Sequence, residues 1–177
     1  INKFKEAKQN HMPDLQIKEI IKDKLYVINI QTLSSSQLSN KYVLEYLSQR
    51  NLIKNNISIK EDIQKHIPSI SFVELPYNED KIYEYLFNGF TVLIYKKEVI
   101  AFETRATLDR GVNPPTSEPT IKGPKDSFNE NYNTNLGLVR KRLKDKNLHI
   151  KELTLGTKTN TKICKNLLFI IFPSYIE

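Results

Sequence analysis

The stretch Phe90–Arg105, FTVLIYKKEVIAFETR, sets the fold class. It contains two runs rich in β-branched and aromatic residues, Thr91–Tyr95 and Val99–Thr104, and such runs are typical of strands. The charged KKE between them leaves room only for a tight turn. The stretch therefore predicts an antiparallel hairpin of two strands.

Upstream of this hairpin, strand-like and helix-like segments alternate. Asn78–Gly89 has apolar residues at helical spacing and a glycine positioned to end the helix. Ser58 and Glu61 form the pattern of a capping box. The predicted elements are a strand at Lys24–Ile30, helices at Asn40–Arg50 and Ser58–His66, a strand at Ile70–Leu75, and the helix at Asn78–Gly89. This alternation predicts an α/β subdomain over residues 22–105, with a mixed sheet whose last strand pair is antiparallel.

The first residues of the chain are charged and weakly patterned. Asp14 is placed to cap a short helix over Leu15–Ile21. Residues 1–21 are therefore predicted to be an N-terminal helical segment.

The chain changes character after the hairpin. Residues 106–126 are rich in proline and glycine, which predicts a stiff extended linker. A helix follows, with Ser127 and Glu130 as its capping box. Its predicted apolar stripe consists of Phe128, Tyr132, Leu136, Val139 and Leu143. Residues 127–177 are interpreted as part of a second α/β subdomain, with a strand at Leu148–Gly156, a polar turn at Thr157–Lys162 and an apolar tail as a candidate strand.

The predicted helix ends in a basic cluster. The chain carries a net charge of +7 and has a pI of about 9.3. Arg140, Lys141, Arg142 and Lys144 lie in its last turns, where cations suit the helix dipole. Three interpretations stay open: the arginines fold back onto acceptors such as Glu118 or Glu130, they meet an anionic lipid or partner protein, or they contact nucleic acid.

No motif points to an enzyme. The sequence has no G-x-S-x-G elbow, dinucleotide fingerprint or complete phosphate-binding loop. His11, His66 and His149 lie far apart in the sequence and none pairs at a ligand spacing, so neither a metal nor another cofactor is predicted. The single Cys164 rules out a disulfide within the chain. The longest apolar run, Leu167–Phe172, is too short to cross a bilayer, so this chain is expected to be soluble.

Residues 117–159 carry a more specific pattern. In order, they hold an acidic-proline step, a G-P-K-x-x-F-x-E segment, an asparagine and an L-V-R-K-R run. The positions are Glu118, Pro119, Gly123, Pro124, Lys125, Phe128, Glu130, Asn135, Leu138, Val139, Arg140, Lys141 and Arg142. This pattern resembles the signature of the A subunits of spore germinant receptors, the GerA family of Bacillus and Clostridium. Residues 24–49 and 85–105 also resemble that family, and the likeness covers most of residues 12–163.

The resemblance implies a receptor with several subunits. Such A subunits are integral membrane proteins whose N-terminal region has two small α/β subdomains and no known enzymatic activity. They work with a transporter-like B subunit and a lipoprotein C subunit in the spore inner membrane, where the N-terminal region is expected to face the core. The residues expected to contact partners or the linker are Glu118, Pro119, Gly123, Pro124, Phe128, Glu130, Asn135, Arg140 and Arg142.

The expected function is therefore non-enzymatic signalling and assembly in a nutrient receptor that triggers germination. The alternatives are direct binding of a nutrient in a cleft between the subdomains, and a basic module that binds nucleic acid. From Cys164 onward the sequence departs from the family pattern, which leaves the second subdomain incomplete. We expect a partner chain to cover it, by homodimerisation or strand exchange.

Overall fold

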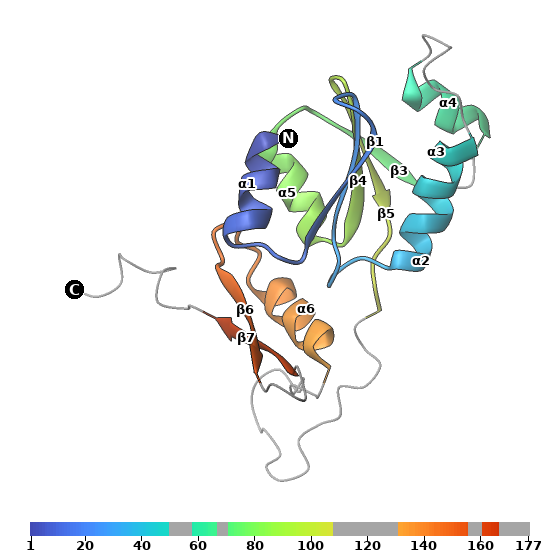
Figure 1. Cartoon of the computed structure of the whole chain (residues 1–177). Coiled ribbons are helices and arrows are strands. Elements are labelled where there is room, and N and C mark those ends of the chain that lie inside the picture. The colour runs from blue at the N-terminus through green and yellow to red at the C-terminus, as the bar shows by residue number, and fades with distance from the viewer. Residues whose placement is uncertain (50–57, 67–70, 108–130, 156–160, 167–177) are drawn as a thin grey trace.

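The computed structural model describes residues 1–49, 58–66, 71–107, 131–155 and 161–166 (Figure 1). The predicted linker at 106–126, apart from its first two residues, and the tail from 167 onward lie outside the described residues. The elements are α1 (Asn2–Asn10), β1 (Leu15–Ile21), β2 (Leu25–Ile30), α2 (Ser36–Ser39), the π-helix η1 (Asn40–Leu44), α3 (Glu45–Gln49), α4 (Ile59–His66), β3 (Phe72–Leu75), α5 (Glu79–Phe87), β4 (Phe90–Tyr95), β5 (Glu98–Glu103), α6 (Tyr132–Arg142), β6 (Ile150–Leu155) and β7 (Thr161–Asn166).

The α/β class is confirmed, but the predicted mixed sheet is wrong. The five-stranded sheet has the order β1-β2-β4-β5-β3, and every neighbouring pair is antiparallel. Helices between strands imply parallel pairing only when they connect neighbouring strands. Here α2, η1, α3 and α4 carry the chain from β2 to β3 at the far edge of the sheet, so the alternation along the sequence does not produce parallel pairs.

The helix predicted over Leu15–Ile21 is also wrong. These residues form β1, which pairs with β2 from Leu15↔Ile30 onward and has an irregularity between Glu19 and Ile21. Asp14 caps no helix there, and its backbone carbonyl accepts a hydrogen bond from Gln31 N at 2.9 Å. Only α1 at the start of the segment is helical.

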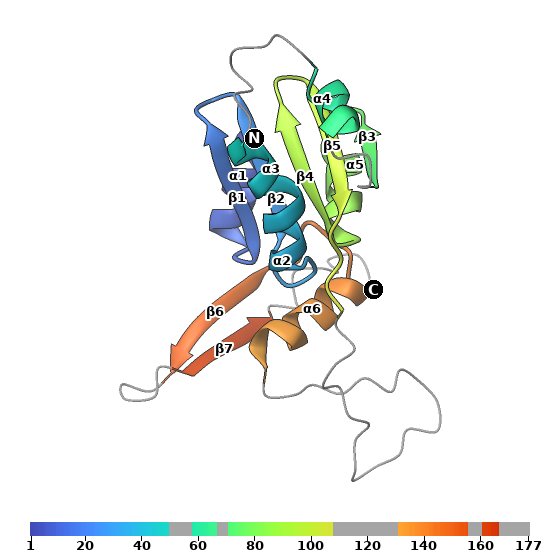
Figure 2. The same cartoon turned by 90° about the vertical axis from the view of Figure 1, so that its right-hand side faces the viewer.

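Helices cover both faces of this sheet (Figure 2). Ile28 of β2 and Val92 of β4 pack toward α1 and α5, together with Phe4 and Leu86. The alternate strand residues, such as Leu93, pack toward α3 and α4 in a second cluster. Strand β2 is buried along its whole length because both of its faces are covered.

The boundaries of α5 follow local chemistry. Asn78 is the N-cap, and its side-chain oxygen accepts hydrogen bonds from Asp80 N and Lys81 N. Gly89 adopts φ +81°, which confirms it as the C-terminal stop. A Cβ at Gly89 would lie 2.7 Å from the carbonyl oxygen of Leu33, so two segments of chain cross here too closely for a side chain.

A smaller unit consists of α6 and the antiparallel pair β6–β7. The helix begins at Tyr132 with Asn131 as its N-cap, and not at the predicted Ser127, which lies outside the described residues. Leu136 packs with Leu148 and Ile150 in a small core that Tyr132 and Val139 flank. Leu143, predicted to be part of the apolar stripe, is 36% exposed because the helix ends just before it.

The predicted strand at Leu148–Gly156 is confirmed as β6, whereas the predicted polar turn ends sooner than expected because β7 begins at Thr161. Among the described residues, no helix is both long and apolar enough to span a bilayer.

Candidate functional site

Only part of the predicted site lies within the described residues. Glu118, Pro119, Gly123, Pro124, Phe128 and Glu130 fall outside them. The remaining three, Asn135, Arg140 and Arg142, are all on α6. Asn135 is half-buried and Arg142 is exposed, whereas Arg140 is buried. The sequence left open which way the arginines point, and the structure separates them.

Arg140 pairs with Asp14, at the start of β1. Its Nη2 donates to Asp14 Oδ1 at 2.9 Å and its Nε donates to Asp14 Oδ2 at 3.2 Å. The side chains are 0% and 3% exposed, respectively. Thr32 Oγ1 donates to Asp14 Oδ2 at 3.0 Å. The acceptor for this arginine is thus a carboxylate 126 residues away, which sequence reasoning had assigned to a helix cap.

The pair fixes the position of α6 against the sheet. Two parallel N–H···O bonds define both distance and orientation, and a lysine could not reproduce them. Removing one partner of such a pair leaves a buried charge without compensation. Arg140 Nη1 is also buried and has no hydrogen-bond partner among the described residues. Arg140 therefore acts as a rigid connection between the two units.

A second contact joins the two units beside this pair. The rings of His11 and His149 lie 4.9 Å apart between centroids, and Ile150 N donates to the carbonyl oxygen of His11 at 3.1 Å. Burial lowers the pKa of His11 below its ordinary value, and His149 and Arg140 lower it further, while a hydrogen bond to the backbone of Lys146 opposes them. These two histidines are far apart in the sequence, and the hydrogen bond from Ile150 N to the carbonyl oxygen of His11 brings their segments together.

No metal centre is visible at this position. Among the residues that the structure describes, no group of three or more His, Cys, Asp and Glu side chains could hold an ion.

The segment after α6 contacts α5 through two lysines. Lys146 Nζ lies 2.7 Å from Asp80 Oδ1 and 3.7 Å from Glu79 Oε1. Lys144 Nζ donates to Asn88 Oδ1 at 2.7 Å. Lys144, which belongs to the predicted basic cluster, therefore bonds to another part of the same chain at the surface.

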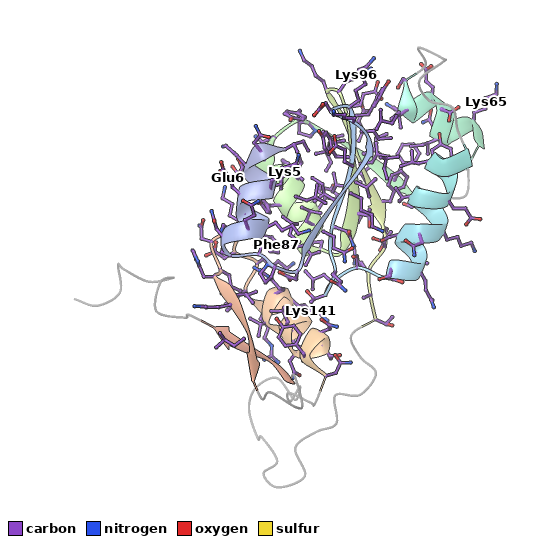
Figure 3. All side chains as sticks on the ribbon, in the orientation of Figure 1. Lys5, Glu6, Lys65, Phe87, Lys96 and Lys141 are labelled. Atoms are coloured by element: carbon purple, nitrogen blue, oxygen red, sulfur yellow. The ribbon has the colours of Figure 1, made fainter. Side chains whose placement is uncertain are left out.

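These contacts border a groove of about 490 Å³ between α5 and residues 144–147. Burial, followed by the charge of Glu79, raises the pKa of Tyr83 in this groove to about 12, while Arg140 opposes the rise. Figure 3 labels Phe87, which lies on the α5 side of this groove. The lining residues are Asp80, Tyr83, Glu84, Phe87, Asn88, Lys144, Asp145, Lys146 and Asn147.

The buried polar side chains of the described residues gather at this same end of the sheet. Thr91 Oγ1 lies 2.8 Å from Ser39 Oγ and 2.7 Å from Thr104 Oγ1. Ala106 N donates to the carbonyl oxygen of Leu33 at 2.9 Å, which fixes the chain where it leaves β5. A satisfied buried network of this kind holds a single arrangement. The polar network thus holds this end of the sheet in place, next to the Asp14–Arg140 pair.

Comparisons with known proteins match most of this chain to one protein family. Residues 2–170 match the model of a family described as "Bacillus/Clostridium GerA spore germination protein". Spore germination protein B1 of Bacillus subtilis is 30% identical over 162 residues, which cover 88% of this chain and 32% of the relative. Spore germination protein GerIA of Bacillus cereus is 30% identical over 129 residues, which cover 71% of this chain and 19% of the relative. The chain thus spans a third or less of the length of these relatives.

A solved structure has the same fold. The crystal structure of the N-terminal domain of the A subunit of the Bacillus megaterium spore germinant receptor GerK3 matches with a TM-score of 0.59 and 20% sequence identity. The match covers 92% of this chain and 60% of that one.

Proposed function

This chain belongs to the GerA family of Bacillus and Clostridium spore germination proteins. We therefore propose that it is a domain of a germinant receptor A subunit that relays the nutrient signal and takes part in assembly of the receptor. It carries no chemistry of its own in this proposal. Its partners are the B and C subunits, and its place is the core-facing side of the spore inner membrane. The fold shared with the N-terminal domain of a receptor A subunit supports this role.

The observation that carries the proposal is the buried Asp14–Arg140 pair. It joins α6 to the residue that precedes β1 through two hydrogen bonds, which set both the distance and the orientation of the two side chains. Packed interfaces of this kind change between discrete arrangements and so can transmit a movement. A partner that moves α6 would therefore move the sheet with it, or break the pair.

Germination of spores tests this role. The full-length receptor would carry Arg140→Lys, which keeps the charge and loses the bidentate geometry. We expect nutrient-triggered germination to slow while the abundance of the subunit stays normal, and Lys141→Arg, on the exposed side of α6, to have no effect. An unchanged germination rate in Arg140→Lys spores with normal subunit abundance would contradict the proposal.

If Arg140→Lys lowers the abundance of the subunit, a second variant is needed to separate folding from function. Asp14→Leu with Arg140→Met replaces the pair by apolar side chains, which commonly restores stability. If that variant accumulates normally and still germinates slowly, the pair is needed for more than folding. If it germinates at the normal rate, the pair serves folding alone and the relay proposal fails.

The groove between α5 and residues 144–147 favours a second candidate, direct binding of a nutrient. Its volume of about 490 Å³ lies in the range of ligand sites. Tyr83 offers an aromatic wall, while Asp80 and Lys144 offer opposite charges, which suits a small zwitterion such as an amino acid. A thermal-shift series with amino acids, sugars and nucleosides tests this candidate, because a ligand that binds the folded state raises the midpoint. A shift that Lys144→Ala abolishes would support binding here, and no shift with any nutrient would count against it.

Binding of nucleic acid has the least support of the three functions. Arg140 is buried, and Lys144 and Lys146 already bond to side chains of the same chain. Pairing of a second copy with the α6 unit is kept as a proposal. The oligomeric state of the purified chain tests it.

A further inference from the structure

The end of the sheet opposite α6 carries a separate cationic surface. Two turns form it, the β1–β2 turn with Lys22 and Lys24 and the β4–β5 turn with Lys96 and Lys97. We call these four residues the lysine tip. All four side chains are exposed, and Lys96 N donates to the carbonyl oxygen of Lys24 at 3.2 Å, which holds the turns side by side. Figure 3 shows Lys96 at the far end of the molecule from Lys141.

Two carboxylates besides Asp23 lie near the tip, and each accepts hydrogen bonds from other groups. Glu98 accepts hydrogen bonds from Ser58 Oγ at 3.3 Å and from Ile59 N at 3.1 Å, so it caps α4. Glu19 accepts the backbone N–H of Asp23 at 2.6 Å. Within the described part of the chain, none of the four lysines of the tip forms a salt bridge with a carboxylate. Asp23, Glu19 and Glu98 are the carboxylates of the two turns and their flanks, so the four lysines exceed them by one charge.

The backbone of the tip does not favour the residues found there. Asp23 has φ +57° and Lys96 has φ +54°, and they are the two non-glycine residues with positive φ in the described chain. Aspartate tolerates this region, but a turn such as the one at Lys96 prefers asparagine or glycine. A lysine at the apex therefore places a cation at an outer position, at some cost in backbone energy.

An aromatic side chain lies beside the lysines. Tyr77 is 58% exposed, and it lines a hollow of about 400 Å³ together with Tyr26, Lys24 and Lys96. Tyrosine is enriched at the boundary between water and lipid, where its ring lies at headgroup level. Lysines near an anionic bilayer each strengthen binding. Because the two turns are at the tip of the sheet, they can contact a flat bilayer surface.

We propose that the lysine tip and Tyr77 bind the surface of a bilayer rich in anionic phospholipid headgroups. The lysines would contact the phosphate groups and Tyr77 would lie among the glycerol and headgroup atoms. This inference does not depend on the proposed relay through Arg140, because that junction lies at the opposite end of the sheet. The basic surface that the sequence suggested on α6 thus has a counterpart on the two hairpin turns.

Sedimentation with lipid vesicles tests the proposal on the full chain. One vesicle would be phosphatidylcholine alone, and the other equal parts of phosphatidylcholine and phosphatidylglycerol. We expect binding to the anionic vesicle only, weakened by salt. Lys96→Glu with Lys97→Glu should lower the partition coefficient at least ~10-fold. Tyr77→Ser should lower it without changing the net charge.

The matched control is a variant in which two lysines at the other end of the molecule are changed to glutamate, as in the tip variant. Lys141 and Lys151 are exposed on α6 and β6, and their change to Glu should lower the partition coefficient less than ~3-fold. If the tip variant unfolds, Lys22→Glu with Lys24→Glu tests the neighbouring turn. Equal losses in the tip and control variants would overturn the proposal. So would binding to soluble polyglutamate with no binding to anionic vesicles, which would indicate an acidic protein partner instead.

Discussion

Arg140 holds a guanidinium group where solvent does not reach, on a helix whose neighbouring basic residues Lys141 and Arg142 are exposed. Burial of this charge is tolerable because Asp14 accepts two of its hydrogen bonds, and Thr32 completes the carboxylate. The spacing of apolar residues identified α6 and its basic end. The spacing could not choose between the two arginines, because the choice depends on the carboxylate of Asp14, which lies just before β1 near the other end of the chain.

Loss of this charge should be costly. Arg140→Met leaves Asp14 buried without its partner, and we expect the free energy of unfolding in urea to fall by about 3–5 kcal/mol. Lys141→Met, on an exposed position of the same helix, should change it by less than ~0.5 kcal/mol. A fall of less than ~1 kcal/mol in Arg140→Met would show that the pair contributes little.

Acid should weaken the junction through His11. Its pKa is lowered in the folded protein from an ordinary value of 6.5, so the unfolded chain takes up the proton first as the pH falls. The stability that depends on neutral His11 is present above the ordinary pKa and is lost as the pH falls from there toward the lowered value.

The melting temperature as a function of pH, with His11→Asn as the comparison, measures this contribution. In the unmodified chain we expect the melting temperature to decline as the pH falls through the ordinary histidine pKa of 6.5. His11→Asn should show a shallower decline, since its side chain does not titrate. Parallel curves for the two proteins would exclude His11 as the source.

Among the elements, those with an apolar run and a clear end signal were predictable. The hairpin β4–β5, the strand β2 and the helix α5 follow from apolar runs bounded by a turn, a cap and a glycine. Strand β1 was not, because the consecutive residues Lys18, Glu19 and Ile20 are all exposed and the irregularity between Glu19 and Ile21 breaks the alternation of buried and exposed residues. An edge strand with such a pattern can be taken for a short helix.

Gly89 tests how tightly these elements cross. Gly89→Ala adds a methyl group at φ +81° and 2.7 Å from the carbonyl oxygen of Leu33. We expect a loss of about 2 kcal/mol or more in the free energy of unfolding, measured in urea. Gln37→Ala, at an exposed position on α2, is the control and should lose less than ~0.5 kcal/mol. If Gly89→Ala matched this control, the crossing would be looser than described.

At the scale of the whole molecule, the sequence indicated two units but not how they meet. The resemblance to receptor A subunits over residues 117–159 gave the family, which the match over residues 2–170 confirms. Contacts such as Asp14–Arg140 and His11–His149 join positions that no local pattern relates. Residues 108–126 of the predicted linker and six of the nine predicted site residues lie outside the described part of the chain, so their roles stay predictions.

Arg140 connects the α6 unit to the sheet through its pair with Asp14. Amide hydrogen exchange, compared between Arg140→Met and Lys141→Met, tests this most directly, since it reports the opening of each element separately. We expect Arg140→Met to accelerate exchange in α6 and β6, while β4 and β5 keep the protection seen in Lys141→Met. Unchanged exchange in α6, or an equal acceleration in every element, would contradict this claim.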